Sequence, residues 1–144
     1  MVGPLQVFAQ ATQKVASKRS GSPPIYCGEV SSTTTRKTIR TQCGIPITAH
    51  KTFREVRGEI DTLLVAGGTA IERDQIPAEV ARWLRKAAGR TRRVGSVCTG
   101  AMLLARAGLL DGHNATTPCD WYHLPMNPLP PAEVGPDPIL LPGL

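Results

Sequence analysis

Residues 60–68, Ile60-Asp61-Thr62-Leu63-Leu64-Val65-Ala66-Gly67-Gly68, form a nearly continuous apolar run that ends in two glycines. Such a run is typical of a strand that is buried on both faces of a parallel sheet. Pro77 then opens an amphipathic helix, residues 92–97 form a second strand, and residues 99–110 form a second helix. Strand, helix, strand and helix in this order predict parallel crossovers and an α/β three-layer sandwich.

The segments on either side of this core are less regular. Gly3-Pro4 opens a predicted helix that gives way to a polar loop from Lys14, residues 25–30 predict a strand, and residues 31–40 suit an exposed edge hairpin. Eight of the 13 prolines lie in the last 27 residues, so the tail is predicted to be loop and strand. No strand is expected before the first helix or helix after the tail, so the domain is expected to be cut at both ends.

Composition limits the possible classes of protein. The chain has 144 residues, of which 41% are hydrophobic, and 17 Lys+Arg against 11 Asp+Glu give a formal charge of +6. These values fit one folded domain and exclude a disordered chain. No apolar run is long enough to span a membrane, and the first residues do not resemble a signal peptide. The sequence therefore predicts a soluble cytoplasmic protein with one partial domain over residues 1–144, no helix-turn-helix domain and no membrane contact.

Cys98 is the strongest candidate for a chemical role. It lies where a predicted strand meets a predicted helix, between the small residues Ser96 and Gly100, which permit a sharp, strained turn. A thiol in that position would form a nucleophile elbow. The alternative is a buried and inert cysteine, and the spacing leaves both interpretations open.

Gly67 and Gly68 end the neighbouring strand at the same edge of the predicted sheet. Their backbone N–H groups, with that of Thr99, are predicted to lie around Cys98 in the manner of an oxyanion hole. The alternative is a plain turn between strand and loop. Two adjacent glycines do not separate these alternatives.

Other common sites are not predicted. Cys27, Cys43 and Cys119 form no C-x-x-C pair, so the sequence predicts no metal site. The glycines after residue 66 are not followed by Gly-Lys-Ser/Thr, so no phosphate-binding loop and no cofactor are predicted.

Seven Lys and Arg residues lie between residues 73 and 93. Three of them decorate the polar side of the predicted helix, so a solvated helix face is preferred over a nucleic-acid interface. No helix-turn-helix motif follows them in this chain. The sequence therefore predicts no direct DNA binding by this chain.

Five motifs carry a resemblance to a known family. They are, in order, Gly3-Pro4-Leu5-Gln6-Val7-Phe8, residues 60–68, Ser96-Val97-Cys98-Thr99-Gly100-Ala101, residues 107–112 with Ala115-Thr116-Thr117, and Pro136-Asp137-Pro138-Ile139. Together they resemble the ThiJ/PfpI family of amidotransferase-like proteins over nearly the whole chain. The chain looks most like the N-terminal domain of AraC-type transcriptional regulators, with isonitrile hydratases as close relatives. This resemblance implies a flavodoxin-like sandwich with a mainly parallel sheet, lacking its first strand and final helix here, and a homodimer in full-length relatives.

Departures from the family pattern bear on function. The family's acidic residue lies three positions before Gly3, where this chain has no residue, and Thr117 is followed by Pro118 where relatives commonly have His. Gln6 replaces a frequent Glu, so it keeps hydrogen bonding and loses the charge of a base. His113 and His123 are expected to be lone exposed residues, and the alternative that one of them approaches Cys98 in place of the missing imidazole stays open.

Two functions remain open from the sequence. The favoured one is a ligand-sensing or vestigial domain of an AraC-type regulator, without catalysis and with a small-molecule ligand. The alternative is a small cysteine-dependent enzyme that uses Cys98, similar to an isonitrile hydratase, a glyoxalase or a peptidase.

Overall fold

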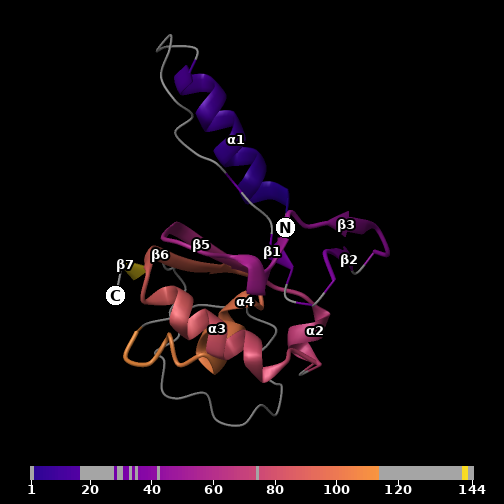
Figure 1. Cartoon of the computed structure of the whole chain (residues 1–144), viewed down its shortest axis with the longest axis vertical. Coiled ribbons are helices and arrows are strands. Elements are labelled where there is room, and N and C mark those ends of the chain that lie inside the picture. The colour runs from indigo at the N-terminus through magenta and orange to yellow at the C-terminus, as the bar shows by residue number, and fades with distance from the viewer. Residues whose placement is uncertain are drawn as a thin grey trace. The chain divides into compact units, whose positions relative to one another are not determined.

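The computed structural model describes residues 2–16, 28, 31–32, 34, 36–41, 43–73, 75–113 and 141–142. The chain forms two compact units, Met1–Glu55 and Val56–Leu144 (Figure 1). Within the part that is described, none of the helices is long and apolar enough to cross a membrane.

The first unit begins with the predicted helix. Helix α1 spans Val2–Ala16, so it continues past Lys14, where the sequence predicted a loop. Leu5 and Phe8 are half-buried, whereas Gln6 and Val7 between them are exposed. The helix is therefore amphipathic, as the spacing of its apolar residues predicted.

Short strands follow α1 in the first unit. Strand β1 (Ser31–Ser32) pairs in parallel with β4 (Lys51–Thr52), and β2 (Thr38–Arg40) pairs antiparallel with β3 (Pro46–Thr48). The predicted hairpin within residues 31–40 is therefore wrong. Its second half pairs instead with the next strand, because the turn is made by Thr41 to Ile45, where Gly44 adopts a φ of 84°.

The second unit contains the predicted strand and helix order. Its elements are β5 (Ile60–Ala66), α2 (Thr69–Glu72), α3 (Ala78–Ala88), β6 (Thr91–Val97), α4 (Gly100–Arg106) and β7 (Leu141–Pro142). Strands β5 and β6 are parallel, with Leu63 beside Val94, and β7 adds to the other edge of β6 in the antiparallel sense. The predicted α/β class with a mainly parallel sheet is confirmed.

Two helices cover one side of this sheet. Both α3 and α4 pack on β6, and α4 also packs on β5 (Figure 1). The most deeply buried apolar side chains come from the two helices and include Val80, Leu103 and Leu104. Helix α4 ends at Arg106, earlier than predicted, because Gly108 adopts a left-handed φ of 68° that stops the helix.

Strand β5 is less buried than its sequence predicted. Val65 is 8% exposed on the side that packs against the helices, whereas Leu64, which points to the opposite face, is 38% exposed. Val97 of β6 is 40% exposed. The prediction of a strand buried on both faces is therefore wrong for Leu64.

Some predicted segments lie outside the described residues. They include the strand over residues 25–30 except Gly28, most of the proline-rich tail, and the residues Cys27, Pro118, Cys119 and His123.

Candidate functional site

Cys98 occupies the turn that joins β6 to α4. Cys98 has a φ of 55°, and among the described residues no other residue except glycine adopts a left-handed backbone. A residue with a side chain pays about 1–3 kcal/mol to adopt such a conformation. Cys98 is also exposed, so the alternative of a buried thiol is excluded.

Gly100 permits this turn because α4 starts directly against strand β5. A Cβ atom on Gly100 would overlap the carbonyl oxygen of Val65 and lie 2.9 Å from its carbonyl carbon. Gly67 is similarly constrained, since a Cβ atom there would lie 2.6 Å from Thr99 Oγ1 and 2.7 Å from Thr99 N. The two glycines therefore let the end of β5 and the start of α4 approach each other closely.

The structure brings Gly67 and Gly68 beside Thr99, and the role of these residues around Cys98 stays a prediction. Their hydrogen bonds, however, are largely internal. Gly67 N donates to Val97 O at 2.9 Å, which extends the β5–β6 ladder beyond its last paired residues. Gly68 N donates to Thr99 Oγ1 at 3.0 Å, and Thr99 is fully buried. Both glycine amides thus already hold an acceptor within the chain.

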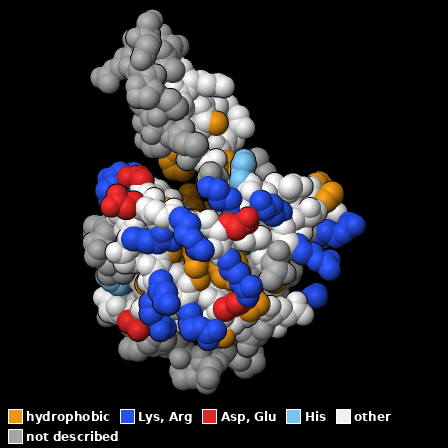
Figure 2. All heavy atoms as spheres, in the orientation of Figure 1, with side chains coloured by type: hydrophobic (Ala, Val, Ile, Leu, Met, Phe, Trp, Pro, Cys, Tyr) orange, Lys and Arg blue, Asp and Glu red, His pale blue; other side chains and the backbone are white. Residues whose placement is uncertain are grey.

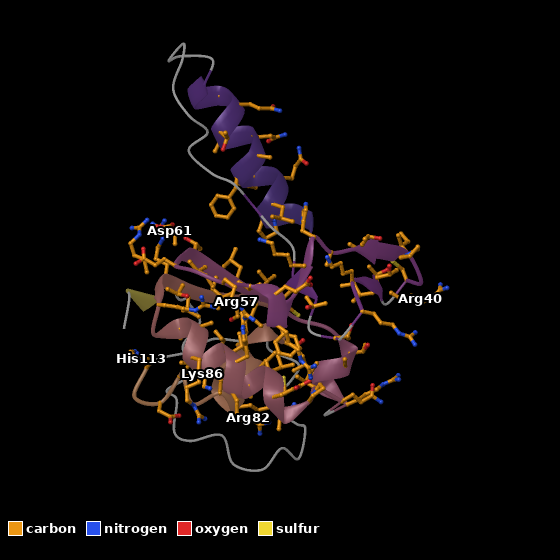
Figure 3. All side chains as sticks on the ribbon, viewed as in Figure 1. Arg40, Arg57, Asp61, Arg82, Lys86 and His113 are labelled. Atoms are coloured by element: carbon orange, nitrogen blue, oxygen red, sulfur yellow. The ribbon has the colours of Figure 1, made fainter. Side chains whose placement is uncertain are left out.

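Other groups considered in the sequence lie elsewhere. Gln6 is exposed on α1 in the first unit, and its role stays a prediction. His113 is half-buried beyond α4, and its backbone N donates to Leu110 O at 3.0 Å (Figure 3). Among the described residues, no three His, Cys, Asp or Glu side chains lie close enough to hold a metal ion.

An ionic cluster lies at the opposite end of the β5–β6 pair from Cys98. Asp61 Oδ1 accepts from Arg92 Nε at 2.6 Å, and Asp61 Oδ2 accepts from Arg93 Nη2 at 2.8 Å (Figure 3). The hydrogen bond from Arg92, followed by that from Thr62, holds the pKa of the Asp61 carboxyl below its usual range. This cluster ties the starts of the two strands together and is structural.

Cys43 is a second exposed thiol, to which the sequence gave no role. It lies in the turn between β2 and β3, 3.2 Å from Thr41 Oγ1. The hydrogen bond with Thr41, and then that with the backbone of Ile45, lowers the pKa of the Cys43 thiol. The Thr-x-Cys-Gly turn is the only signal in the sequence that points to this environment.

Comparison with known proteins decides the family. The model of the DJ-1/PfpI family matches residues 1–121. The chain belongs to the DJ-1/PfpI family. The resemblance to ThiJ/PfpI proteins that its five motifs carried is therefore confirmed.

Curated relatives of this DJ-1/PfpI chain fall into different functional classes. A protein of Streptomyces lividans, named as an uncharacterized protein in the cpoL 5′ region, is 33% identical over 127 residues, which is 84% of this chain and 77% of that protein. The HTH-type transcriptional regulator GbdR of Pseudomonas aeruginosa is 44% identical over 57 residues, 40% of this chain and 15% of GbdR. An isonitrile hydratase of Pseudomonas putida is 33% identical over 86 residues, 59% of this chain and 36% of the hydratase.

A solved structure shares the fold. The ThiJ/PfpI family protein from Pseudomonas syringae superposes with a TM-score of 0.56 at 24% identity, over 62% of this chain and 37% of that one. The flavodoxin-like fold implied by the family is consistent with this likeness and with the parallel β5–β6 pair.

Proposed function

We propose that this chain is a ligand-sensing or vestigial DJ-1/PfpI domain of an AraC-type transcriptional regulator and that it does not catalyse a reaction. Cys98, Gly67, Gly68 and Thr99 would form its binding site, and the role of Gln6 stays a prediction from the sequence. Similarity to the regulator GbdR supports the class of protein.

The observation that carries the proposal is the hydrogen bonding of the two glycine amides. An oxyanion hole needs N–H groups that point at the developing charge and are not already committed to another acceptor. Gly67 N donates to Val97 O and Gly68 N donates to Thr99 Oγ1. This arrangement argues against an oxyanion hole built from these two amides, and so favours a domain that does not catalyse a reaction.

The sequence adds a second reason. Pro118 takes the place of the imidazole that commonly follows Ala-Thr-Thr in the family, and proline has no side chain that can transfer a proton. Gln6 likewise replaces a carboxylate by an amide. A nucleophilic thiol normally works with a base beside it, so these replacements favour binding over turnover.

The partners that we propose are those expected of an AraC-type regulator. The domain would bind a small-molecule ligand without a metal or cofactor, and the full-length regulator would be a homodimer in the cytoplasm. Sedimentation equilibrium of the full-length regulator tests the dimer, and a monomer at all concentrations would refute that part.

One observation favours a second function. Cys98 is exposed at a strained left-handed φ, which is the geometry of a nucleophile elbow, and the chain is similar to an isonitrile hydratase. The alternative is therefore a Cys98-dependent enzyme with hydratase, glyoxalase or peptidase activity.

Steady-state assays with an isonitrile and with methylglyoxal separate the two functions. The matched variants are Cys98→Ser, which removes the proposed nucleophile, and Cys43→Ser, which removes the other exposed thiol. A sensing domain gives no turnover above the Cys98→Ser background with either compound. Turnover by the unaltered chain and by Cys43→Ser that is lost in Cys98→Ser would establish the enzyme instead.

A further inference from the structure

The outer side of α3 carries basic side chains that the site around Cys98 does not use. Arg82, Arg85 and Lys86 are all exposed, and Arg85 and Lys86 follow Arg82 by three and four positions, so they lie on the same side of the helix as Arg82. Figure 2 shows Lys and Arg side chains over α3 in that view, with Asp and Glu side chains among them, and Figure 3 labels Arg82 and Lys86 on α3. We refer to Arg82, Arg85 and Lys86 as the α3 basic face.

The chain holds some of its cations in place without neutralising them. Arg85 Nε donates to Ala107 O at 2.8 Å. Arg90, just beyond the end of α3, donates from Nη2 to Val56 O at 3.2 Å and from Nη1 to Gly58 O. A main-chain carbonyl orders a guanidinium group without removing its positive charge, so Arg85 and Arg90 stay cationic where they are held.

The arginines at the start of β6, unlike the α3 basic face, form ion pairs. There the carboxylate of Asp61 pairs with both Arg92 and Arg93. None of the ion pairs found among the described residues involves the α3 basic face. Arg82, Arg85 and Lys86 therefore hold no ion pair within 4 Å among the described residues, although Asp111 lies near Arg85 and Glu79 lies on the same helix.

The surroundings of these cations favour one class of anion. Large apolar side chains exposed within the described residues are Val7, Ile45, Leu64 and Val97, none of which lies on α3. Protein interfaces depend on apolar and aromatic residues at their centre, and membrane-bound helices insert apolar side chains into the lipid. A row of cations without such anchors fits the phosphate backbone of a nucleic acid best.

We propose that the α3 basic face contacts the phosphate backbone of double-stranded DNA without reading its sequence. This proposal departs from the prediction of no direct DNA binding, which stays untested, because the cations share an exposed side of one helix and hold no ion pair among the described residues. The inference goes beyond the proposed function and does not rest on it, since the DNA contact would exist whether or not the Cys98 site binds a ligand.

Fluorescence anisotropy with a 20-bp duplex of arbitrary sequence tests the contact with the full chain. Three phosphate contacts give a slope of log affinity against log salt of about −2.7, so binding weakens about 40-fold between 50 and 200 mM salt. In the double variant Arg82→Glu/Lys86→Glu the slope is expected to fall by about 2 in magnitude. Arg82→Gln/Lys86→Gln is expected to do the same without introducing negative charge. A duplex of unrelated sequence is expected to bind equally well.

The matched control is Arg36→Glu/Arg40→Glu, which changes the net charge by the same amount but on the first unit. Its slope of log affinity against log salt is expected to equal that of the unaltered chain. The proposal is overturned if this control weakens binding as much as the α3 variants, since the attraction would then come from net charge alone. It is equally overturned if the folded chain does not bind the duplex at 50 mM salt, or if it prefers an acidic peptide or vesicles of anionic lipid. Circular dichroism of each variant checks that it is folded.

Discussion

At the scale of single residues, the turn at Cys98 depends on the absence of side chains at Gly67 and Gly100. The left-handed backbone of Cys98 is held because Gly100 lets α4 begin against the Val65 carbonyl and Gly67 leaves room for Thr99. The small residues on both sides of Cys98 were visible in the sequence and predicted a sharp turn. The hydrogen bond from Gly68 N to Thr99 Oγ1 was not predictable, because the sequence does not say which acceptor a turn amide meets.

The close approach at Gly100 predicts a sharp difference between two glycines. Gly100→Ala is expected to destabilise the fold by about 3 kcal/mol, because the new methyl group would overlap backbone that cannot move away easily. Gly68→Ala is the matched control, since a Cβ atom there meets nothing within 4 Å and the φ of 163° is extended. Urea unfolding measures both. Equal losses of stability would contradict the described packing of α4 on β5.

Thr99 is expected to stabilise the site through its hydroxyl group. Thr99→Val keeps the shape of the side chain but leaves the Gly68 amide without its acceptor, which costs about 1–3 kcal/mol. Thr99→Ser keeps the acceptor and is expected to lose less. Thermal unfolding compares the two variants, and a Ser variant less stable than the Val variant would argue against the hydrogen bond.

At the scale of elements, the sequence predicted helices and strands best where the apolar periodicity agrees with the residues that start or end an element. Pro77 and the apolar stripe of Val80, Leu84 and Ala87 place α3 almost to the residue, because a helix buries one side only. The prediction was poorer at residues 31–40, where short β-branched stretches do not specify which neighbour they pair with. Strand pairing there depends on the turn at Gly44, and therefore on contacts beyond the segment.

The two leucines of different burial predict unequal effects on stability. Leu104→Ala in α4 is expected to cost about 2–5 kcal/mol, because the side chain is 1% exposed and its removal leaves a cavity. Leu64→Ala in β5 removes the same atoms from a side chain that is 38% exposed, so a clearly smaller loss is expected. Chemical denaturation measures both, and a larger loss for Leu64→Ala would show that this face of β5 is covered.

The ion pairs between β5 and β6 predict a dependence of stability on pH. The pKa of Asp61 is lowered in the folded chain, so its contribution is fully present above the unfolded value of about 3.9 and is lost as the pH falls below it. The melting temperature of the unaltered chain is therefore expected to fall more steeply between pH 5 and pH 3 than that of Asp61→Asn. Because Asp61 is exposed, 1 M salt is expected to reduce the difference. Identical pH profiles for the two proteins would contradict a role for this carboxylate.

At the scale of the whole molecule, the family was predictable and the function less so. Five ordered motifs indicated the family, and its model matches residues 1–121. Function depends on finer details than motif order, since the proteins that this chain is similar to include a transcriptional regulator and an isonitrile hydratase. From the sequence, a solvated helix face is preferred for the basic residues between 73 and 93, which carry part of the charge of +6. For the part of that charge on the exposed side of α3, the proposed partner is the phosphate backbone of DNA.

Mass spectrometry of the intact chain after incubation with an isonitrile tests the central proposal most directly. A thiol that attacks the isonitrile carbon gains the full mass of the compound, and hydrolysis of that adduct releases a formamide. The sensing domain proposed here predicts an unchanged protein mass and no formamide over many hours. An adduct on Cys98 together with formamide, both absent from Cys98→Ser, would contradict the account and establish an enzyme.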